Sequence, residues 1–364
     1  MTIRFISWAT GGIGAVALRT ALKRGYQCVG VLCYDDQKVG KDAGEIAGLE
    51  LRTGIKATKN KEDIYALDAE IVIHAPMIHP DKPHEFHREV LRLLESGKNV
   101  ITTVDYFHIA GSRYPELAQE IEAACRKGNS TVMGTGNSPG YIPEVLTTTL
   151  TRHVAEIDHI EILEKMDCSY MSPAGFPVMG FGMSPAEFEN IGIAKMWDHM
   201  FRQSPAAICH LLNAPVDDVL MTRRVGVADK ALVLPSKVTV EPGKVVANAW
   251  RWSAIVQGKP LVEYETRWML DAQMPGWEAD NSWTITIEGK PSIQLVHKRA
   301  VSWKDGIRRG GAYGDEKYPY RECVHGSAGG MLVNSLQGVI DAPPGNFLAP
   351  VFGAYQYFDR AVVK

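Results

Sequence analysis

The sequence lacks the features that mark several large classes of protein. Its 364 residues include only six cysteines, and no C-x-x-C pair is present, so we expect reduced thiols and no zinc site or disulfide framework. No apolar run reaches the roughly 18 to 20 residues that span a bilayer. The chain also enters the strand-like segment IRFIS without a leader. We therefore expect a cytoplasmic protein that does not bind a membrane.

An excess of positive charge is absent as well. The formal net charge is −3, and Lys and Arg form no local cluster. Such a chain supplies no positive field for a nucleic-acid backbone, so DNA and RNA are not expected as partners. With 45% hydrophobic residues over this length, the chain can bury a large core, and two domains are favoured over one.

The first part of the chain alternates strand-like and helical patterns. Apolar runs such as EIVIHA and NVITT precede helical patterns such as HEFHREVLRLLESG and ELAQEIEAACRKG. This alternation predicts an α/β fold with a doubly wound, parallel Rossmann sheet over residues 1–152. Gly25, Gly97 and Gly128 follow helical patterns and are predicted to mark helix ends.

The pattern changes after residue 152. Long alternating runs such as VVANAWRWSAIVQG and LVEYETRWML are joined by short turns such as QGKP, and AEFENIGIAKMWDHMFRQ is helical. We predict a second α/β domain with a mixed, largely antiparallel sheet over residues 153–325. Residues 326–364 are predicted to form a helix, which ends before Pro-Pro-Gly, and a tail that packs back on the first domain.

A glycine-rich turn follows the first predicted strand. It consists of Ala9, Thr10, Gly11, Gly12, Ile13 and Gly14. The strand-turn-helix context is the one that the dinucleotide fingerprint G-x-G-x-x-G requires. Ala9 replaces the first glycine, and alanine can serve there if the turn keeps a negative φ. Gly11 would let a diphosphate approach the backbone, and Gly14 would let helix and strand pack closely. The motif favours a bound dinucleotide over a glycine-rich turn without a ligand.

Acidic and basic residues follow the second predicted strand. Asp35 lies about 20 residues beyond the glycines, where an acid commonly holds the ribose hydroxyls of NAD. Lys38 complicates this, because a flexible lysine beyond the strand can accept the 2′-phosphate of NADP. NAD is therefore favoured without excluding NADP. The other interpretation of Asp35 is a solvated turn acid.

The ends of the next three strands supply further candidates, because ligands of such sheets bind outside the carboxyl ends of the strands. Ala75 and Pro76 follow the third strand and are predicted to run along the cofactor. Thr103 and Asp105 follow the fourth strand and Asn137 the fifth, and these are predicted near the nicotinamide. Asn137 is a candidate orienting group, although an ordinary loop amide explains it equally well.

Several segments carry a family resemblance over nearly the whole chain: WATGGIGAVALR, VGKDAGEIAG, NVITT, GTGNSPGYIPEVL and APPG. Together they resemble the dihydrodipicolinate reductase-like NAD(P)-dependent oxidoreductases, in the branch of 2,4-diaminopentanoate dehydrogenase and the native amine dehydrogenases. The resemblance implies a homodimer, a Rossmann domain joined to an α/β substrate domain, and a nicotinamide in the cleft between them. For some members it implies reversible oxidative deamination of amines.

The resemblance also implies a catalytic carboxylate. The family's glutamate lies two residues after the strand that matches NVITT, and Asp105 occupies that position here, with a side chain one methylene shorter. A general base must come within hydrogen-bond reach of the proton that it moves. Asp105 is therefore predicted either as the acid/base group, directly or through a water, or as an anchor of its loop.

The segment EILEKMDCSYMSPAG departs from dihydrodipicolinate reductase itself. The lysine and paired histidines of that enzyme have no counterpart here, so a role in lysine biosynthesis is not expected. Tyr170 is a candidate proton donor or, more simply, part of an apolar wall. The methionines and phenylalanines around it favour a hydrophobic substrate, although a core or a dimer contact explains them almost as well.

Two other constellations do not support a function. His74, His79, His84 and His87 lack the H-E-x-x-H spacing of a zinc site, so no metal is predicted. The segment HGSAGG lacks the pattern of a serine hydrolase elbow. It is predicted to open the last helix, where small residues permit close packing on the first domain or on a partner subunit.

The sequence thus predicts an NAD(P)-dependent oxidoreductase. Hydride would pass between the nicotinamide and the C=N or C=O carbon of a small, fairly hydrophobic amine, imine or ketone, with Asp105 as acid/base group and Asn137 as orienter. A carbonyl reductase or alcohol dehydrogenase of the same fold is one alternative. A non-catalytic dinucleotide sensor is another. The predicted partners are a small-molecule substrate and a second copy of the chain.

Overall fold

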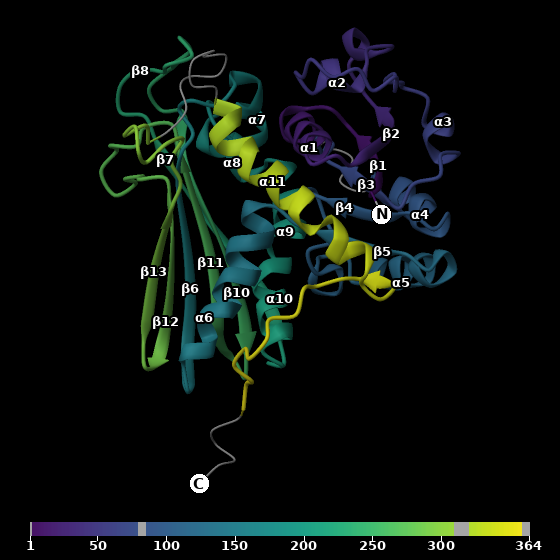
Figure 1. Cartoon of the computed structure of the whole chain (residues 1–364). Coiled ribbons are helices and arrows are strands. Elements are labelled where there is room, and N and C mark those ends of the chain that lie inside the picture. Colours follow the sequence, from purple (N-terminus) through teal and green to yellow (C-terminus); the bar gives the residue numbers. More distant parts are fainter. Residues whose placement is uncertain (1, 79–84, 309–319, 359–364) are drawn as a thin grey trace. The chain divides into compact units, whose positions relative to one another are not determined.

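A computed structural model describes residues 2–78, 85–308 and 320–358, apart from the side chains of residues 320–323 (Figure 1). The chain divides into two compact units. The first comprises Met1–Tyr141 and Val324–Leu348, and the second Ile142–Cys323 and Ala349–Lys364. The functional roles predicted for residues 1–152, 153–325 and 326–364 stay predictions.

The first unit contains a parallel sheet with the strand order β14-β5-β4-β3-β1-β2. This confirms the predicted doubly wound fold. Its strands are β1 (Arg4–Trp8), β2 (Gln27–Leu32), β3 (Ile71–His74), β4 (Asn99–Thr102), β5 (Thr131–Gly134) and β14 (Gly345–Asn346). Its helices are α1 (Gly12–Lys23), α2 (Ala43–Ile46), α3 (Lys61–Tyr65), α4 (His87–Glu95), α5 (Leu117–Gly128) and most of α11 (Tyr320–Ile340).

The central strands form because their residues are apolar on both faces. Every residue of β3 and β5 is buried, as expected for a parallel sheet covered by helices on both sides. The amphipathic helices supply that cover. In α1 the buried residues recur at helical spacing and include Val16, Ala17 and Leu18.

The last helix of the chain returns to this unit. α11 begins at Tyr320, upstream of the HGSAGG segment that the sequence predicts to open it. A Cβ added to Gly329 would lie 3.0 Å from the Cγ1 atom of Val16 and 3.1 Å from the backbone nitrogen of Ala17. Glycine therefore lets α11 pack directly on α1. Beyond the helix, β14 pairs with β5.

All three glycines predicted to mark helix ends lie at helix ends, and two of them take the left-handed conformation. Gly25 and Gly97 follow α1 and α4 with φ of +77° and +86°, the left-handed conformation that commonly ends a helix. The helix α5 also ends at Gly128, but Gly128 is its last helical residue, and Asn129 takes the left-handed position with φ +50°. A Cβ on Gly128 would overlap the carbonyl of Leu94, so this glycine serves the close packing of α5 on α4.

The second unit contains a sheet with the strand order β13-β12-β6-β11-β10-β7. β6 and β11 run parallel and the other neighbours antiparallel, which confirms the predicted mixed sheet. Its strands are β6 (Glu156–Asp167), β7 (Asp218–Val227), β10 (Val245–Val256), β11 (Lys259–Met269), β12 (Ser282–Lys290) and β13 (Ile293–Lys298), with β8 (Leu232–Val233) and β9 (Thr239–Val240) as a separate pair. Its helices are α6 (Thr147–Leu150), α7 (Phe176–Met179), α8 (Pro185–Glu189), α9 (Ile193–Phe201) and α10 (Gln203–Leu211).

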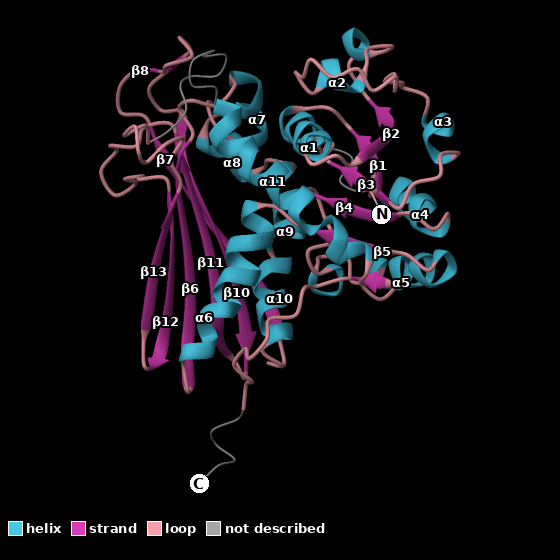
Figure 2. Cartoon of the chain, viewed as in Figure 1, coloured by secondary structure: helices cyan, strands magenta, loops and turns pink. Residues whose placement is uncertain are grey.

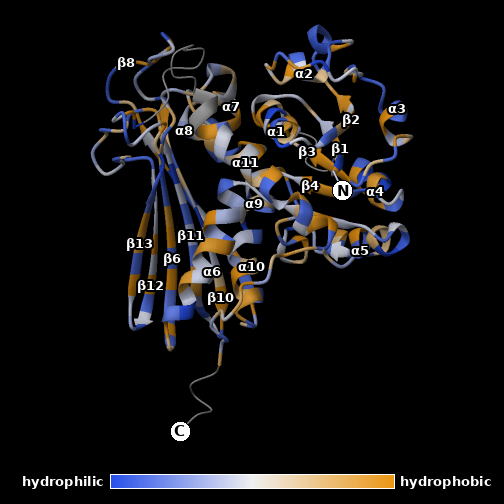
Figure 3. Cartoon of the chain, viewed as in Figure 1, coloured by the Kyte–Doolittle hydropathy of each residue, from blue (hydrophilic) through white to orange (hydrophobic). Residues whose placement is uncertain are grey.

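Helices cover one face of this second sheet (Figure 2). Figure 3 shows hydrophobic and hydrophilic residues alternating along its long strands, the pattern of a sheet with two unlike faces. On the helix side, Phe201 of α9 stacks on Trp252 with ring centroids 4.9 Å apart, and Trp197 meets Trp268 edge-on at 5.4 Å. These aromatic contacts anchor α9 to the sheet.

Candidate functional site

The turn after β1 leads directly into the N-terminus of α1. Gly11 occupies the capping position and has no side chain to cap the helix, and the first turn of α1 contains no acidic residue. The first backbone amides of a helix lack intrahelical partners and carry the positive end of its dipole. An end of this kind is suited to bind a phosphate group.

The glycines of the turn have different roles. Gly11 is exposed, its φ is −69°, and a Cβ added to it would meet nothing within 4 Å. Its own backbone therefore does not require glycine, and the space in front of it is open to a ligand. A Cβ added to Gly14 would instead overlap the carbonyl oxygen of Ala9. Gly14 thus permits the close approach of helix and strand that the motif predicts.

Ala9 does not have the negative φ expected for an alanine at this place. Its φ is +75°, whereas alanine was expected only with a negative φ. The left-handed conformation costs an L-residue roughly 1–2 kcal/mol. Ala9 is buried, and its amide donates a hydrogen bond of 3.0 Å to the carbonyl of Leu32. Surrounding structure therefore holds alanine in the conformation that glycine usually supplies at this place.

The loop after β2 is tied to this turn. The Nζ atom of Lys38 donates a hydrogen bond of 2.6 Å to the carbonyl oxygen of Thr10. Asp35 is exposed, and its Oδ1 atom accepts a hydrogen bond of 2.9 Å from the amide of Gln37. The lysine therefore reaches back to the glycine-rich turn, while the carboxylate of Asp35 faces solvent.

The segment after β3 lies beside the same turn. Ala75 and Pro76 are buried, and the amide of Ala75 donates a hydrogen bond of 3.0 Å to the carbonyl of Trp8. The methyl group of Ala75 would lie 3.8 Å from a Cβ added to Gly14. These residues form one wall of the turn.

The segment after β4 crosses the end of β5. The Oδ1 atom of Asp105 accepts a hydrogen bond of 2.7 Å from the amide of Tyr106, which has a φ of +62°. A Cβ on Gly134 would overlap the carbonyl oxygen of Asp105. Asp105 is half-buried, as is Thr103, whose amide donates a hydrogen bond of 3.3 Å to the carbonyl of His74. Both residues therefore lie at the carboxyl edge of the sheet.

Asn137 lies at this edge as well. It begins the irregular helical segment Asn137–Leu146, which follows β5. The segment turns sharply at Ser138–Gly140, where the backbone is not helical, and the amide of Tyr141 donates a hydrogen bond of 2.8 Å to the carbonyl of Gly136. Asn137 is half-buried. The structure thus brings the predicted residues of the first unit to one edge of one sheet.

Tyr170 belongs to the second unit, just after β6. It is half-buried. In the methionine- and phenylalanine-rich segment that follows, Phe176 and Phe181 are buried and meet edge-to-face with centroids 6.1 Å apart. The segment thus forms a packed apolar cluster.

Of the four histidines weighed as metal ligands, only His74 and His87 lie in the described part of the chain. His79 and His84 lie outside the described residues. His74 is fully buried, burial lowers its pKa to about 3, and its Nδ1 atom lies 2.9 Å from the hydroxyl of Thr102. His87 contacts the hydroxyl of Tyr106 at 3.0 Å. Within the described ranges, no three His, Cys, Asp or Glu side chains are arranged to hold a metal ion, and no helix has the length and apolar character to cross a membrane.

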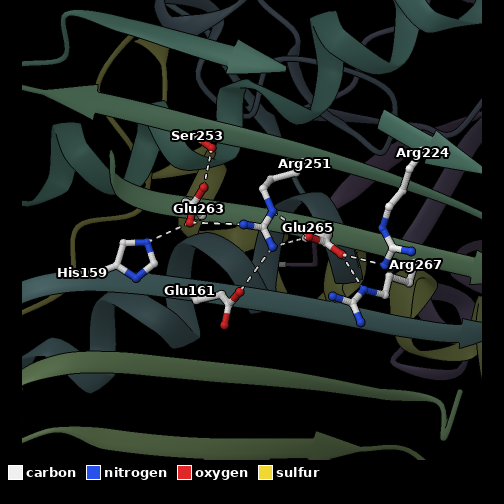
Figure 4. Close-up of polar contacts among 8 residues, drawn as sticks. All are labelled: His159, Glu161, Arg224, Arg251, Ser253, Glu263, Glu265 and Arg267. Atoms are coloured by element: carbon white, nitrogen blue, oxygen red, sulfur yellow. Dashed lines mark hydrogen bonds and ion pairs between the residues drawn. The ribbon is translucent and has the colours of Figure 1, made fainter. Parts of the chain in front are cut away.

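Sequence reasoning missed a charged network on the open face of the second sheet (Figure 4). Glu265 accepts hydrogen bonds from Arg267 and, at 2.6 Å, from Arg251. Burial alone would raise the pKa of Glu265, but the hydrogen bonds from these two arginines lower it. Arg224 lies 3.8 Å away, and an open hollow adjoins the group. The alternation of RWSAIV and VEYETRW is the signal that places these charges on one face.

Comparison with known proteins identifies relatives that cover most of the chain. Residues 141–307 match the family described as 2,4-diaminopentanoate dehydrogenase C-terminal domain. An amine dehydrogenase of Streptomyces virginiae is 24% identical over 359 residues, which cover 94% of each chain. A 2,4-diaminopentanoate dehydrogenase of Acetoanaerobium sticklandii is 24% identical over 216 residues, which cover 57% of this chain and 59% of that protein.

The fold is also that of a solved relative. The structure of an amine dehydrogenase from Mycobacterium smegmatis superposes with a TM-score of 0.76 at 20% identity, covering 96% of this chain and 95% of the other. The family model covers most of the second unit, and this superposition includes residues of both units. Residues 141–307 are thus similar to the 2,4-diaminopentanoate dehydrogenase C-terminal domain, and the chain has the fold of an amine dehydrogenase.

Proposed function

We propose that this chain is an NAD(P)-dependent oxidoreductase of the amine dehydrogenase type. The observation that carries the proposal is the open, uncapped N-terminus of α1 at Gly11, on the same sheet edge as Asp105 and Asn137. A bound nicotinamide dinucleotide supplies hydride exchange with a carbon atom of the substrate. The protein binds and orients the two reactants.

The residues present fit such a dinucleotide. The turn from Ala9 to Gly14 would hold the diphosphate, because Gly11 leaves its backbone bare. Ala75, Pro76 and Thr103 would line the path towards the nicotinamide. The exposed carboxylate of Asp35 would accept hydrogen bonds from the adenosine ribose.

We propose that the chain binds NAD in preference to NADP. The carboxylate of Asp35 would repel a 2′-phosphate, and Lys38 donates its hydrogen bond to the turn. Lys59, another cation of this loop, pairs with Asp36 at 2.8 Å. These contacts favour a ribose with free hydroxyls over the phosphate of NADP.

Asp105 is the proposed acid/base group. One oxygen of Asp105 accepts a hydrogen bond from the amide of Tyr106. This hydrogen bond fixes the direction of the carboxylate. A positioned carboxylate can take a proton from a substrate or return one, directly or through a water. Asn137 is the proposed orienting group, and Tyr170 is proposed to line the substrate site.

The substrate is proposed to be a small, fairly hydrophobic amine, or the ketone or imine related to it. The names of the two relatives support an amine. The apolar cluster around Phe176 and Phe181 supports a hydrophobic side chain. A carbonyl reductase of the same fold would act on the ketone without ammonia.

The experiment is a substrate panel. The purified chain is mixed with NADH or NADPH and hydrophobic ketones, with and without ammonium, and the loss of reduced nicotinamide is followed. Turnover that requires ammonium supports an amine dehydrogenase, and turnover without it indicates a carbonyl reductase. Cofactor binding without any turnover would indicate a dinucleotide sensor instead.

We also propose that the chain forms a homodimer in the cytoplasm. The open face of the second sheet carries both Arg251 and Glu265, and a surface with both signs of charge can pair with its own copy about a two-fold axis. Sedimentation analysis should give the mass of two chains. The mass of a single chain at micromolar concentration would contradict this proposal.

A further inference from the structure

The imidazole of His325 lies against the N-terminus of α1. A Cβ added to Gly12, the first residue of that helix, would overlap the Cε1 and Nδ1 atoms of the ring. Only a glycine at this position lets the imidazole come so close. Both residues belong to the first unit.

A line of contacts between two helices holds the ring there. His325 lies beside Gly12, and Gly329 lies beside Val16. Further along, the guanidinium of Arg24 donates a hydrogen bond of 2.5 Å to the side chain of Asn334. The contacts advance together along both sequences, so α1 and α11 run in the same direction. Their N-terminal ends therefore lie at the same edge of the sheet.

This position gives the HGSAGG segment a use beyond helix packing. The amides at the start of α1 attract an anion, and an imidazole carries a nitrogen that can donate a hydrogen bond to one. Hydrogen bonds to charged groups are stronger than those between neutral groups. An anion seated on the bare backbone at Gly11 would lie close to the neighbouring residue Gly12, against which the ring rests.

We propose that His325 is a diphosphate-binding residue of the dinucleotide site. This inference rests on the proposed function, because it assigns one more contact to the same cofactor. The ligand class is a nucleoside diphosphate or a dinucleotide. The imidazole would supply a hydrogen bond to the diphosphate, whereas Asp35 would serve the ribose.

The test compares ligands that differ in one phosphate. Calorimetry with the full chain measures the dissociation constants of ADP, AMP and NADH for the wild type, His325→Ala and His325→Gln. His325→Ala should raise the dissociation constants of ADP and NADH about tenfold, the effect of one hydrogen bond to a charged group. The ratio of the dissociation constants of AMP and ADP should therefore fall in His325→Ala. His325→Gln keeps an N–H donor, so this ratio should be partly restored.

Two further variants separate binding from packing. Asn334→Ala removes another contact of the same helix and should leave all three dissociation constants unchanged. Gly12→Ala must displace the imidazole, so it should reproduce the loss seen with His325→Ala. In the His325→Ala background it should add little.

The outcomes are distinct. If the wild type binds NADH and ADP but His325→Ala keeps the full preference for ADP over AMP, the inference is overturned and the proposed function stands. A thermal midpoint that falls with unchanged dissociation constants would show that His325 only packs. If the wild type binds none of the three ligands, the proposed function fails together with the inference.

Discussion

The ammonium group of Lys38 donates a 2.6 Å hydrogen bond to the carbonyl oxygen of Thr10, and so joins the loop after β2 to the glycine-rich turn after β1. Lys38→Met keeps much of the apolar stem and removes the donor. Because the turn loses a contact that both cofactors depend on, the dissociation constants of NAD and NADP should rise together, by roughly three- to tenfold. Calorimetry with both cofactors measures the effect.

The two cofactors distinguish this role from the one that sequence alone suggests. A lysine that binds a 2′-phosphate would weaken NADP and spare NAD. A selective loss of NADP affinity in Lys38→Met would therefore contradict the structural role of Lys38.

Ala9 has a positive φ, so glycine should be accepted there without the usual cost. Ala9→Gly relieves roughly 1–2 kcal/mol of backbone strain and adds about 0.5–1 kcal/mol of unfolded-state entropy. The free energy of unfolding should stay the same or rise by up to about 1 kcal/mol. Ala17→Gly, in the helical backbone of α1, is the control and should lose about 1 kcal/mol or more. Equal losses in both variants, measured by denaturant unfolding, would argue against the left-handed turn.

Asp105 can be changed with little disturbance of its loop. In Asp105→Asn the side-chain oxygen can still accept a hydrogen bond from the amide of Tyr106, but the amide side chain can no longer take a proton. Turnover should fall by about 10²-fold or more, while the dissociation constant of the cofactor and the thermal midpoint stay the same. A fall of less than about tenfold, below the usual contribution of an acid/base group, would make Asp105 a loop anchor.

His74 should make stability depend on pH. Burial lowers its pKa to about 3, whereas in the unfolded chain the group titrates near its ordinary value of 6.5. Between these two pKa values the unfolded chain binds more protons than the folded chain. The contribution of His74 to the free energy of unfolding is therefore fully present above pH 6.5, and it is lost as the pH falls, by up to about 1.4 kcal/mol per pH unit.

A variant without a titrating group isolates this effect. His74→Asn keeps an acceptor for the hydroxyl of Thr102 and carries no ionisable group. The difference in unfolding free energy between wild type and variant should therefore narrow as the pH is lowered below 6.5. A difference that stays constant with pH would mean that the imidazole is not held neutral.

The first sheet is predictable because local sequence determines it. Runs such as IVIH and NVIT are mostly apolar and almost entirely buried, as a strand covered on both faces requires. The turn at Gly11 follows from the same kind of local pattern. The loop after β2 does not, because the carboxylate of Asp42 organises it through hydrogen bonds to the amides of Gly44, Thr53 and Gly54. Thr53 and Gly54 are 11 and 12 residues away from Asp42, too far along the chain for a periodicity to reveal.

The site is predictable in position and less so in detail. Strand ends place Asp105 and Asn137 correctly at one edge, but the conformation of Ala9 depends on a hydrogen bond to Leu32 in another strand. The ion pairs of Glu265 depend on strand register, which aligns Arg251 with Glu265 across β10 and β11. The approach of His325 to Gly12 joins residues from opposite ends of the chain.

The proposed function depends on the bare backbone at Gly11, which is proposed to bind the diphosphate of a nicotinamide dinucleotide. A Cβ at Gly11 would meet no atom within 4 Å apart from its chain neighbours, so we expect Gly11→Val to fold as the wild type does. Gly338→Ala, at another open position, is the control. Calorimetric titration should show that NADH binds to the wild type and to the control. For Gly11→Val the dissociation constant should be at least about tenfold higher, because the valine side chain occupies the place of the phosphate. Unchanged binding in a folded Gly11→Val, or no heat from any chain with either cofactor, would contradict the account.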